Sequence, residues 1–135
     1  MLTTKFSKSW NGKLFPDFFD TIRLSDTDKY FLGAEHDIVL EGVNMGTAEI
    51  MGIRTLPFNA IRDVQSFLSA GLPAAKFCGF LKNTYNGDVN GGVQPDTEFQ
   101  QITYRWKQRN YPAHQGYIAS FMEDKLREYR EALGN

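Results

Sequence analysis

The C-terminal part of the chain carries the most regular hydrophobic pattern. Over residues 115–133, apolar side chains recur at intervals of three and four, which predicts an amphipathic helix that ends at Gly134. Segments 58–70 and 73–85 show the same helical spacing, whereas segment 86–96 is rich in Gly, Asn and Asp and predicts a long loop. Helices are therefore expected in the middle of the chain and at its end.

Strand patterns fill the first half of the chain and one segment of the second. Residues 99–107 alternate, with apolar side chains on one side and Thr103, Arg105 and Lys107 on the other, which predicts a half-buried strand with a basic outer face. Segments rich in β-branched residues predict four more strands, at 2–7, 21–24, 36–41 and 46–56. The last two predict a hairpin because only a short glycine-bounded connection separates them. A single helical turn is predicted over 15–20, whose proline suits the start of a helix.

Composition places the chain among ordinary globular domains. It has 135 residues, 41% hydrophobic and 23% charged, so it is long enough for one domain with its own core. The net charge of -1 means that any affinity for nucleic acid must come from a local patch of cations. A single cysteine, and no apolar stretch of signal-peptide or membrane-spanning length, predict a cytoplasmic protein.

Metal, thiol and phosphate-loop chemistry find little support in the sequence. His36 and His114 lie far apart without a carboxylate triad nearby, so we interpret them as surface histidines and expect no metal site. Cys78 sits among apolar residues of a predicted helix, which favours a buried structural thiol over a nucleophile. No glycine-rich loop links a strand to a helix, so no nucleotide cofactor is expected.

The triplet Thr21-Ile22-Arg23 is the most informative short motif. Two residues apart on a predicted strand, the Thr21 and Arg23 side chains share a face. A hydroxyl beside a guanidinium is a natural anchor for a phosphate or the edge of a nucleobase. The alternative is a solvated strand face, which such a common triplet also fits.

The order of motifs along the chain carries a family resemblance. It runs from the Thr21–Arg23 strand through Tyr-Phe-Leu-Gly at 30–33 and the strand at 46–50 to two helices ending at 82–85 and the aromatic strand at 99–107. This order, over about residues 3–107, resembles that of ASCH domains, which belong to the PUA-like β-barrel superfamily. The resemblance implies an α+β fold: a small, partly closed β-barrel over residues 1–110 with inserted helices. A C-terminal helix over 111–135 would pack on the barrel or at a dimer interface.

One position departs from the family pattern. ASCH domains typically carry a Lys-x-x-Thr-x-Arg signature; Thr21 and Arg23 match it, but Phe18 stands in place of the lysine. Some small ASCH proteins resemble amidohydrolases acting on acylated cytidine, in which this lysine and threonine act together with a glutamate. Glu49 is the candidate glutamate here, although it also fits a solvated strand carboxylate. Because the amine is missing, the resemblance implies a binding module, with a hydrolase of acylated nucleosides as the alternative.

The leading hypothesis is a module that binds RNA or a modified nucleotide in a cleft of the barrel. The candidate binding residues are Thr21, Arg23, Arg54, Arg105, Lys107 and Trp10. Thr21 and Arg23 would form the cleft floor, and the other cations would contact phosphates. Trp10, on a loop between two lysines, would stack on a base, unless it packs against the barrel edge as a hydrophobic plug.

The apolar stripe of the C-terminal helix is expected to pack against another surface. Its polar face mixes both charge signs, which indicates solvation and not nucleic-acid binding. Either the helix packs on its own barrel, or it pairs with the same helix in a second subunit to form a homodimer. A third hypothesis for the whole chain is a protein-interaction domain whose exposed surface is this helix.

Overall fold

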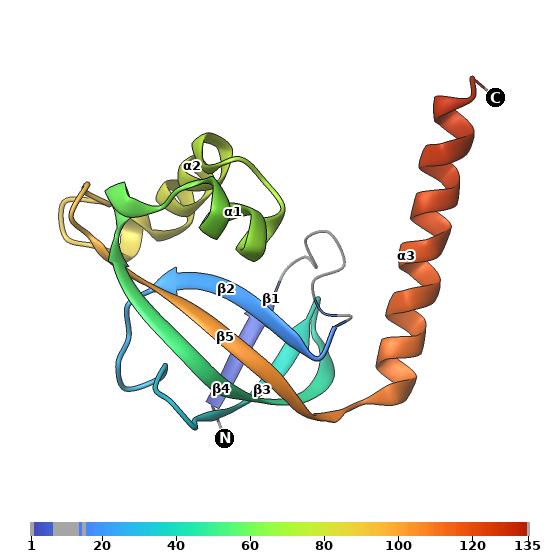
Figure 1. Ribbon diagram of the computed structural model, residues 1–135, viewed down its shortest axis with the longest axis horizontal. Helices are drawn as coiled ribbons and strands as arrows, with labels where there is room; N and C mark the ends of the chain where they lie inside the picture. Colours follow the sequence, from blue (N-terminus) through green and yellow to red (C-terminus); the bar gives the residue numbers. More distant parts are fainter. Residues whose placement is uncertain (1, 7–13, 15, 135) are drawn as a thin grey trace.

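A five-stranded sheet organises the fold, in a computed structural model that describes residues 2–6, 14 and 16–134. Its strands are β1 (Leu2–Phe6), β2 (Phe18–Leu24), β3 (Glu35–Leu40), β4 (Val43–Pro57) and β5 (Glu98–Arg109), in the spatial order β1-β3-β4-β5-β2. All neighbours are antiparallel except β1 and β3, which run parallel. The long strands β4 and β5 curl strongly, so that the sheet forms a half-barrel (Figure 1). This confirms an α+β fold with a curled sheet; membership of the PUA-like class stays a prediction.

Three α-helices accompany the sheet. They are α1 (Asp63–Ala70), α2 (Ala74–Tyr85) and α3 (Tyr111–Ala132), and short 3-10 helices occur at Phe58–Ala60 and Asn86–Asp88. α1 and α2 lie together over one end of the sheet, whereas α3 leaves the end of β5 and runs alongside the molecule as a separate rod (Figure 1). Among the described residues no helix is long and apolar enough to span a lipid bilayer.

Two hydrophobic cores hold these parts together. The concave face of the sheet buries an aromatic group in which Phe19 stacks on Tyr104, with ring centres 5.1 Å apart, and tilts against Trp106. On the opposite face, Ile22 and Phe99 pack beneath Phe77 of α2 in a second core. Because neighbouring residues of one strand point to opposite faces, β2 and β5 contribute to both cores.

The predicted helical turn over 15–20 is wrong for the residues that the structure describes. Phe18 to Asp20 form the start of β2 and pair with Thr103 to Arg105 of β5. The Asp20 carboxylate also accepts hydrogen bonds from the Thr103 hydroxyl (2.7 Å) and the Gln101 side-chain amide (3.0 Å). Pairing with a strand more than 80 positions away in the sequence therefore overrides the local signal of the proline.

The other predicted elements are present with shifted ends. The β3–β4 hairpin has a tighter turn than expected, because Glu41 and Gly42 both adopt positive φ, as a two-residue turn of the primed type requires. The predicted helix at 58–70 is divided, and only α1 is α-helical. α3 begins four residues early, since the Asn110 side chain caps it and a proline fits its first turn.

α3 is attached to the half-barrel only by its first turns. His114 is buried, and its Nε2 donates to the Met45 carbonyl over 2.8 Å. Ala113 and Tyr117 pack against the main core, but from Ile118 onward most apolar side chains of the helix are exposed. Packing of α3 on its own barrel is therefore limited to residues before 118 and at the partly buried Phe121.

Candidate functional site

Arg23 is held in a fixed position at the open edge of the half-barrel. Its Nε donates to the Thr21 hydroxyl (3.1 Å), its Nη2 donates to the Lys5 carbonyl (2.9 Å), and its guanidinium carbon lies 4.7 Å from the centre of the Phe6 ring. In the part of the chain that the structure describes, nothing accepts a hydrogen bond from Nη1. The guanidinium is thus pre-oriented and keeps one group of donors for an external acceptor.

Thr21 and Arg23 share a face of β2, as the sequence predicts, but their roles differ. Thr21 is buried, and its hydroxyl is occupied as the acceptor for Arg23. It cannot touch a ligand from this position. Thr21 therefore orients Arg23 instead of forming the floor of an open cleft.

A surface groove begins at Leu24, the residue after Arg23, and Arg23 itself is not part of its lining. It has a volume of about 840 Å³ and runs between the β2–β3 loop and the segment that joins α2 to β5. Its lining includes Asp26, Lys29, Tyr30, Tyr85, Asp88 and Glu98. Two tyrosines, one amine and three carboxylates in one groove of this size are a mixture of apolar and polar groups that suits a small ligand.

The electrostatics of Lys29 and Tyr30 connect this groove to Arg23. Burial lowers the pKa of the Lys29 ammonium, the positive charges of Arg23 and Lys5 lower it further, and the Asp26 carboxylate opposes them. Burial raises the pKa of the Tyr30 hydroxyl, while the charge of Arg23 opposes that rise. Lys29 also lies 5.3 Å above the Tyr30 ring. The charges of Arg23 and Lys5 thus act on the one cation that lines the groove, Lys29, whose side chain is partly buried.

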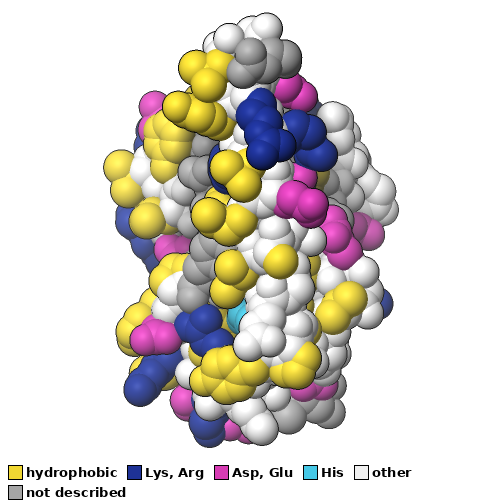
Figure 2. Space-filling view, turned by 90° about the vertical axis from the view of Figure 1, so that its right-hand side faces the viewer, with side chains coloured by type: hydrophobic (Ala, Val, Ile, Leu, Met, Phe, Trp, Pro, Cys, Tyr) yellow, Lys and Arg dark blue, Asp and Glu magenta, His cyan; other side chains and the backbone are white. Residues whose placement is uncertain are grey.

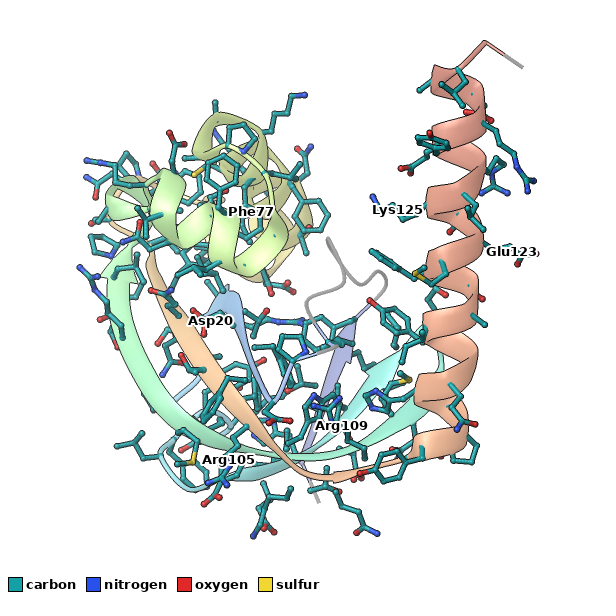
Figure 3. The ribbon with its side chains drawn as sticks, turned by 45° about the vertical axis from the view of Figure 1, so that its right-hand side comes forward. Asp20, Phe77, Arg105, Arg109, Glu123 and Lys125 are labelled. Carbon is teal, nitrogen blue, oxygen red and sulfur yellow. The ribbon has the colours of Figure 1, made fainter. Side chains whose placement is uncertain are left out.

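The remaining predicted cations lie on the other side of the sheet. Arg105 pairs with Glu49 across β4 and β5 and points away from the half-barrel interior (Figure 3). Lys107 forms an ion pair with Glu35, and Arg54 lies opposite Gln101, on the same outer face. The sheet therefore separates Arg54, Arg105 and Lys107 from Arg23, and carboxylates alternate with them.

The predicted catalytic pair is also divided by the sheet. Thr21 pairs with Ile102, which faces the buried core, whereas Glu49 pairs with Arg105 on the outer face. Phe18, in the position of the family's lysine, is exposed on this outer face next to Arg105. The structure thus brings together Thr21 and Arg23, but not Thr21 and Glu49. Trp10 lies outside the described residues.

Both histidines are buried, so their interpretation as surface residues is wrong. His36 Nδ1 lies 2.7 Å from the Thr4 hydroxyl and 3.2 Å from the Tyr104 hydroxyl, and Nε2 lies 2.9 Å from the Lys29 carbonyl. Burial lowers the pKa of His36 and of His114. Each imidazole thus fills a core position and is held by at least one hydrogen bond. Nδ1 of His114 is the exception, since it has no hydrogen-bond partner among the described residues.

The described residues contain no cluster of three or more potential metal ligands from His, Cys, Asp and Glu. Cys78 is half-buried on α2, and burial raises the pKa of its thiol, as expected for an unreactive cysteine.

Sequence reasoning missed Lys29, Tyr30 and Tyr85 as site residues. Lys29 and Tyr30 follow a polar loop in which Asp26 accepts a hydrogen bond from the Asp28 backbone, and surface loops often carry binding residues. That polar loop could have pointed to Lys29 and Tyr30 from the sequence alone. Tyr85 had no such signal, because its place beside Tyr30 depends on how α2 packs across the end of the sheet.

Comparison with known proteins adds no family to this geometry. No protein-family model, curated protein or solved structure matches this chain.

Proposed function

We propose that this protein binds a single nucleotide in the groove next to Arg23. The observation that carries the proposal is the fixed guanidinium of Arg23, which keeps Nη1 for an external acceptor and whose charge acts on Lys29, a residue of the groove lining. A phosphate would accept from Arg23 and Lys29, since a fixed guanidinium binds phosphate with good geometry.

Charge in the groove favours one nucleotide over a long RNA. Asp26, Asp88 and Glu98 line the groove with Lys29, so a chain of phosphates crossing it would meet more carboxylates than cations. Around Lys29 the balance is reversed, because two further cations, Arg23 and Lys5, act there with one carboxylate, Asp26. A ligand with one anionic end and one end that donates hydrogen bonds matches this division, as a nucleoside monophosphate with its amino-substituted base does.

Aromatic side chains supply the apolar contacts that a base needs. Tyr85 is half-buried with its edge against Phe99, and Tyr30 is stacked against His36 with ring centres 5.7 Å apart. Tyr30 is buried between His36 and Lys29, so the ring available for stacking is that of Tyr85, and base stacking on such a ring typically contributes about 1–3 kcal/mol. The proposed activity is binding alone.

Isothermal titration calorimetry with cytidine and adenosine 5′-monophosphates, the free nucleosides and inorganic phosphate tests this proposal. Replacing Lys29 with Gln removes one charged donor, so we expect nucleotide affinity to fall about 10- to 100-fold. Nucleoside affinity should change little, whereas Tyr85→Ala should weaken both. Arg54→Gln makes the same change of charge at a residue outside the groove lining and serves as the control.

Arg23→Gln should reduce nucleotide affinity at least as much as Lys29→Gln, provided that circular dichroism shows an intact fold. Binding of neither nucleotide, or losses as large for Arg54→Gln as for Lys29→Gln, would overturn the proposal. The salt dependence gives a second check, since contact with one phosphate predicts a slope of about -1 or shallower in log affinity against log salt.

A further inference from the structure

The outer part of α3 presents a continuous apolar stripe to solvent. Met122, Leu126, Tyr129 and Leu133 are each more than half exposed. Figure 2 shows hydrophobic side chains following one another along this side of the molecule. α3 has 22 residues and a length of about 33 Å, and helices without tertiary packing are marginally stable in water. We therefore expect the stripe to pack against a partner surface.

The spacing of the stripe specifies what kind of surface fits. Its four members are separated by four, three and four residues, which is the alternation of core positions in a two-stranded coiled coil. Toward the N-terminus the next core positions hold Ala119 and Gln115, so the apolar seam is confined to the last three turns. A single helix with the same seam is the simplest complement.

Charged residues at the edges of the stripe decide the orientation of such a partner. Glu123 and Arg130 each follow a core residue directly, and Lys125 precedes one. Lys125 forms an ion pair with Glu128 within the helix, whereas Glu123 and Arg130 have no ion-pair partner among the described residues. They lie on the same flank of the seam, two turns apart.

We infer that α3 pairs antiparallel with α3 of a second copy of this chain. In an antiparallel pair, residues of this flank face each other, so Glu123 of each copy lies near Arg130 of the other, twice by symmetry. In a parallel pair, Lys125 would instead face Arg130 of the other copy, and like charges would repel. Charge complementarity thus selects a second copy in the antiparallel orientation.

The short seam also sets the strength and shape of the dimer. Only about three turns overlap, so the interface is smaller than those of permanent dimers, and we expect dissociation in the micromolar range. The two half-barrels would lie at opposite ends of the helix pair. Dimerisation is therefore independent of the groove beside Arg23 and does not rest on nucleotide binding.

Sedimentation equilibrium of the full chain and three variants tests the inference. Leu126→Glu places a charge in the seam and should leave a monomer at about 100 µM, with its helical content checked by circular dichroism. Arg130→Glu turns two attractions into two repulsions and should weaken the dimer about tenfold. The double variant Glu123→Arg with Arg130→Glu should restore the original affinity.

Two of the variants distinguish an antiparallel from a parallel dimer or serve as a control. In a parallel dimer, Arg130→Glu would face Lys125 and tighten association, so a tighter dimer would overturn the antiparallel assignment. Arg127→Glu makes the same change of charge on the outer side of the helix and should leave affinity unchanged. A full-length protein that stays monomeric at about 100 µM, with or without nucleotide, would overturn the inference and mean that a different protein covers the stripe.

Discussion

Replacing Gly46 with Ala should destabilise the protein far more than the same change at Gly42. Gly46 lies in β4, opposite Arg109 of β5, with φ at +125°. A Cβ added there would come within 2.1 Å of the Gln108 carbonyl oxygen and 2.9 Å of the Arg109 Cα. Both are backbone atoms, so no side-chain rotation can relieve the clash, and the two longest strands would have to separate locally.

The expected size follows from two contributions. A positive φ costs an L-residue about 1–2 kcal/mol, and forced displacement of well-packed neighbours costs about 1–3 kcal/mol more. The Gly46→Ala change should therefore lower the free energy of unfolding by about 2–5 kcal/mol, a large part of a typical total of about 5–15 kcal/mol. Gly42 also has positive φ, at +81°, but a Cβ there meets no atom within 4 Å. Only the first contribution applies to it.

Urea unfolding followed by tryptophan fluorescence measures the difference, because Trp106 is buried next to this part of the sheet. The two variants share the residue change and the sign of φ, so their difference isolates the close approach of β4 and β5. Equal losses of stability, within about 0.5 kcal/mol, would refute the reasoning. They would show that the strands adjust at little cost.

Two further outcomes follow from the buried polar groups. Burial lowers the pKa of His36 and His114 in the folded state, so the unfolded chain binds more protons than the folded one as the pH falls. The free energy of unfolding should therefore reach its full value above about pH 6.5, the ordinary histidine pKa, and decrease as the pH drops toward the lowered pKa values. Urea midpoints at about pH 7.5 and about pH 5 should show this fall, and His114→Gln should reduce it; an unchanged fall would contradict a role for His114. We also expect no release of cytidine from N4-acetylcytidine, measured by chromatography, because Thr21 is buried and the sheet separates it from Glu49. Turnover that disappears in Thr21→Val would reverse that conclusion.

The strands and helices with clear periodicity could be predicted from the sequence. β5 alternates cleanly, because one face of the sheet buries Ile102 and Tyr104 while the other exposes Arg105. β2 gives no such signal, since its residues contribute to cores on both faces of the sheet. Its first three residues therefore resembled a helical turn.

The candidate site could be predicted only at the level of one strand. Thr21 and Arg23 share a face for a local reason, the alternation of side chains along β2. Which face of the sheet carries Arg54 and Arg105 depends on the register between β4 and β5, including two irregularities in their pairing. The burial of His36 likewise depends on Thr4 and Tyr104, which are distant in sequence. Contacts of this kind cannot be predicted from the pattern of neighbouring residues in the sequence.

The strand order has a consequence for how the chain folds during synthesis. β2 pairs only with β5, so that Leu24 lies opposite Phe99 and Phe18 opposite Arg105. At about 5–20 residues per second, β2 waits roughly 4–17 s after its own synthesis before its partner strand is complete. During that interval Phe19 and Ile22, which each anchor a different core, have no sheet to join. The nascent chain is thus most prone to aggregation or chaperone capture after β4 has formed and before β5 arrives.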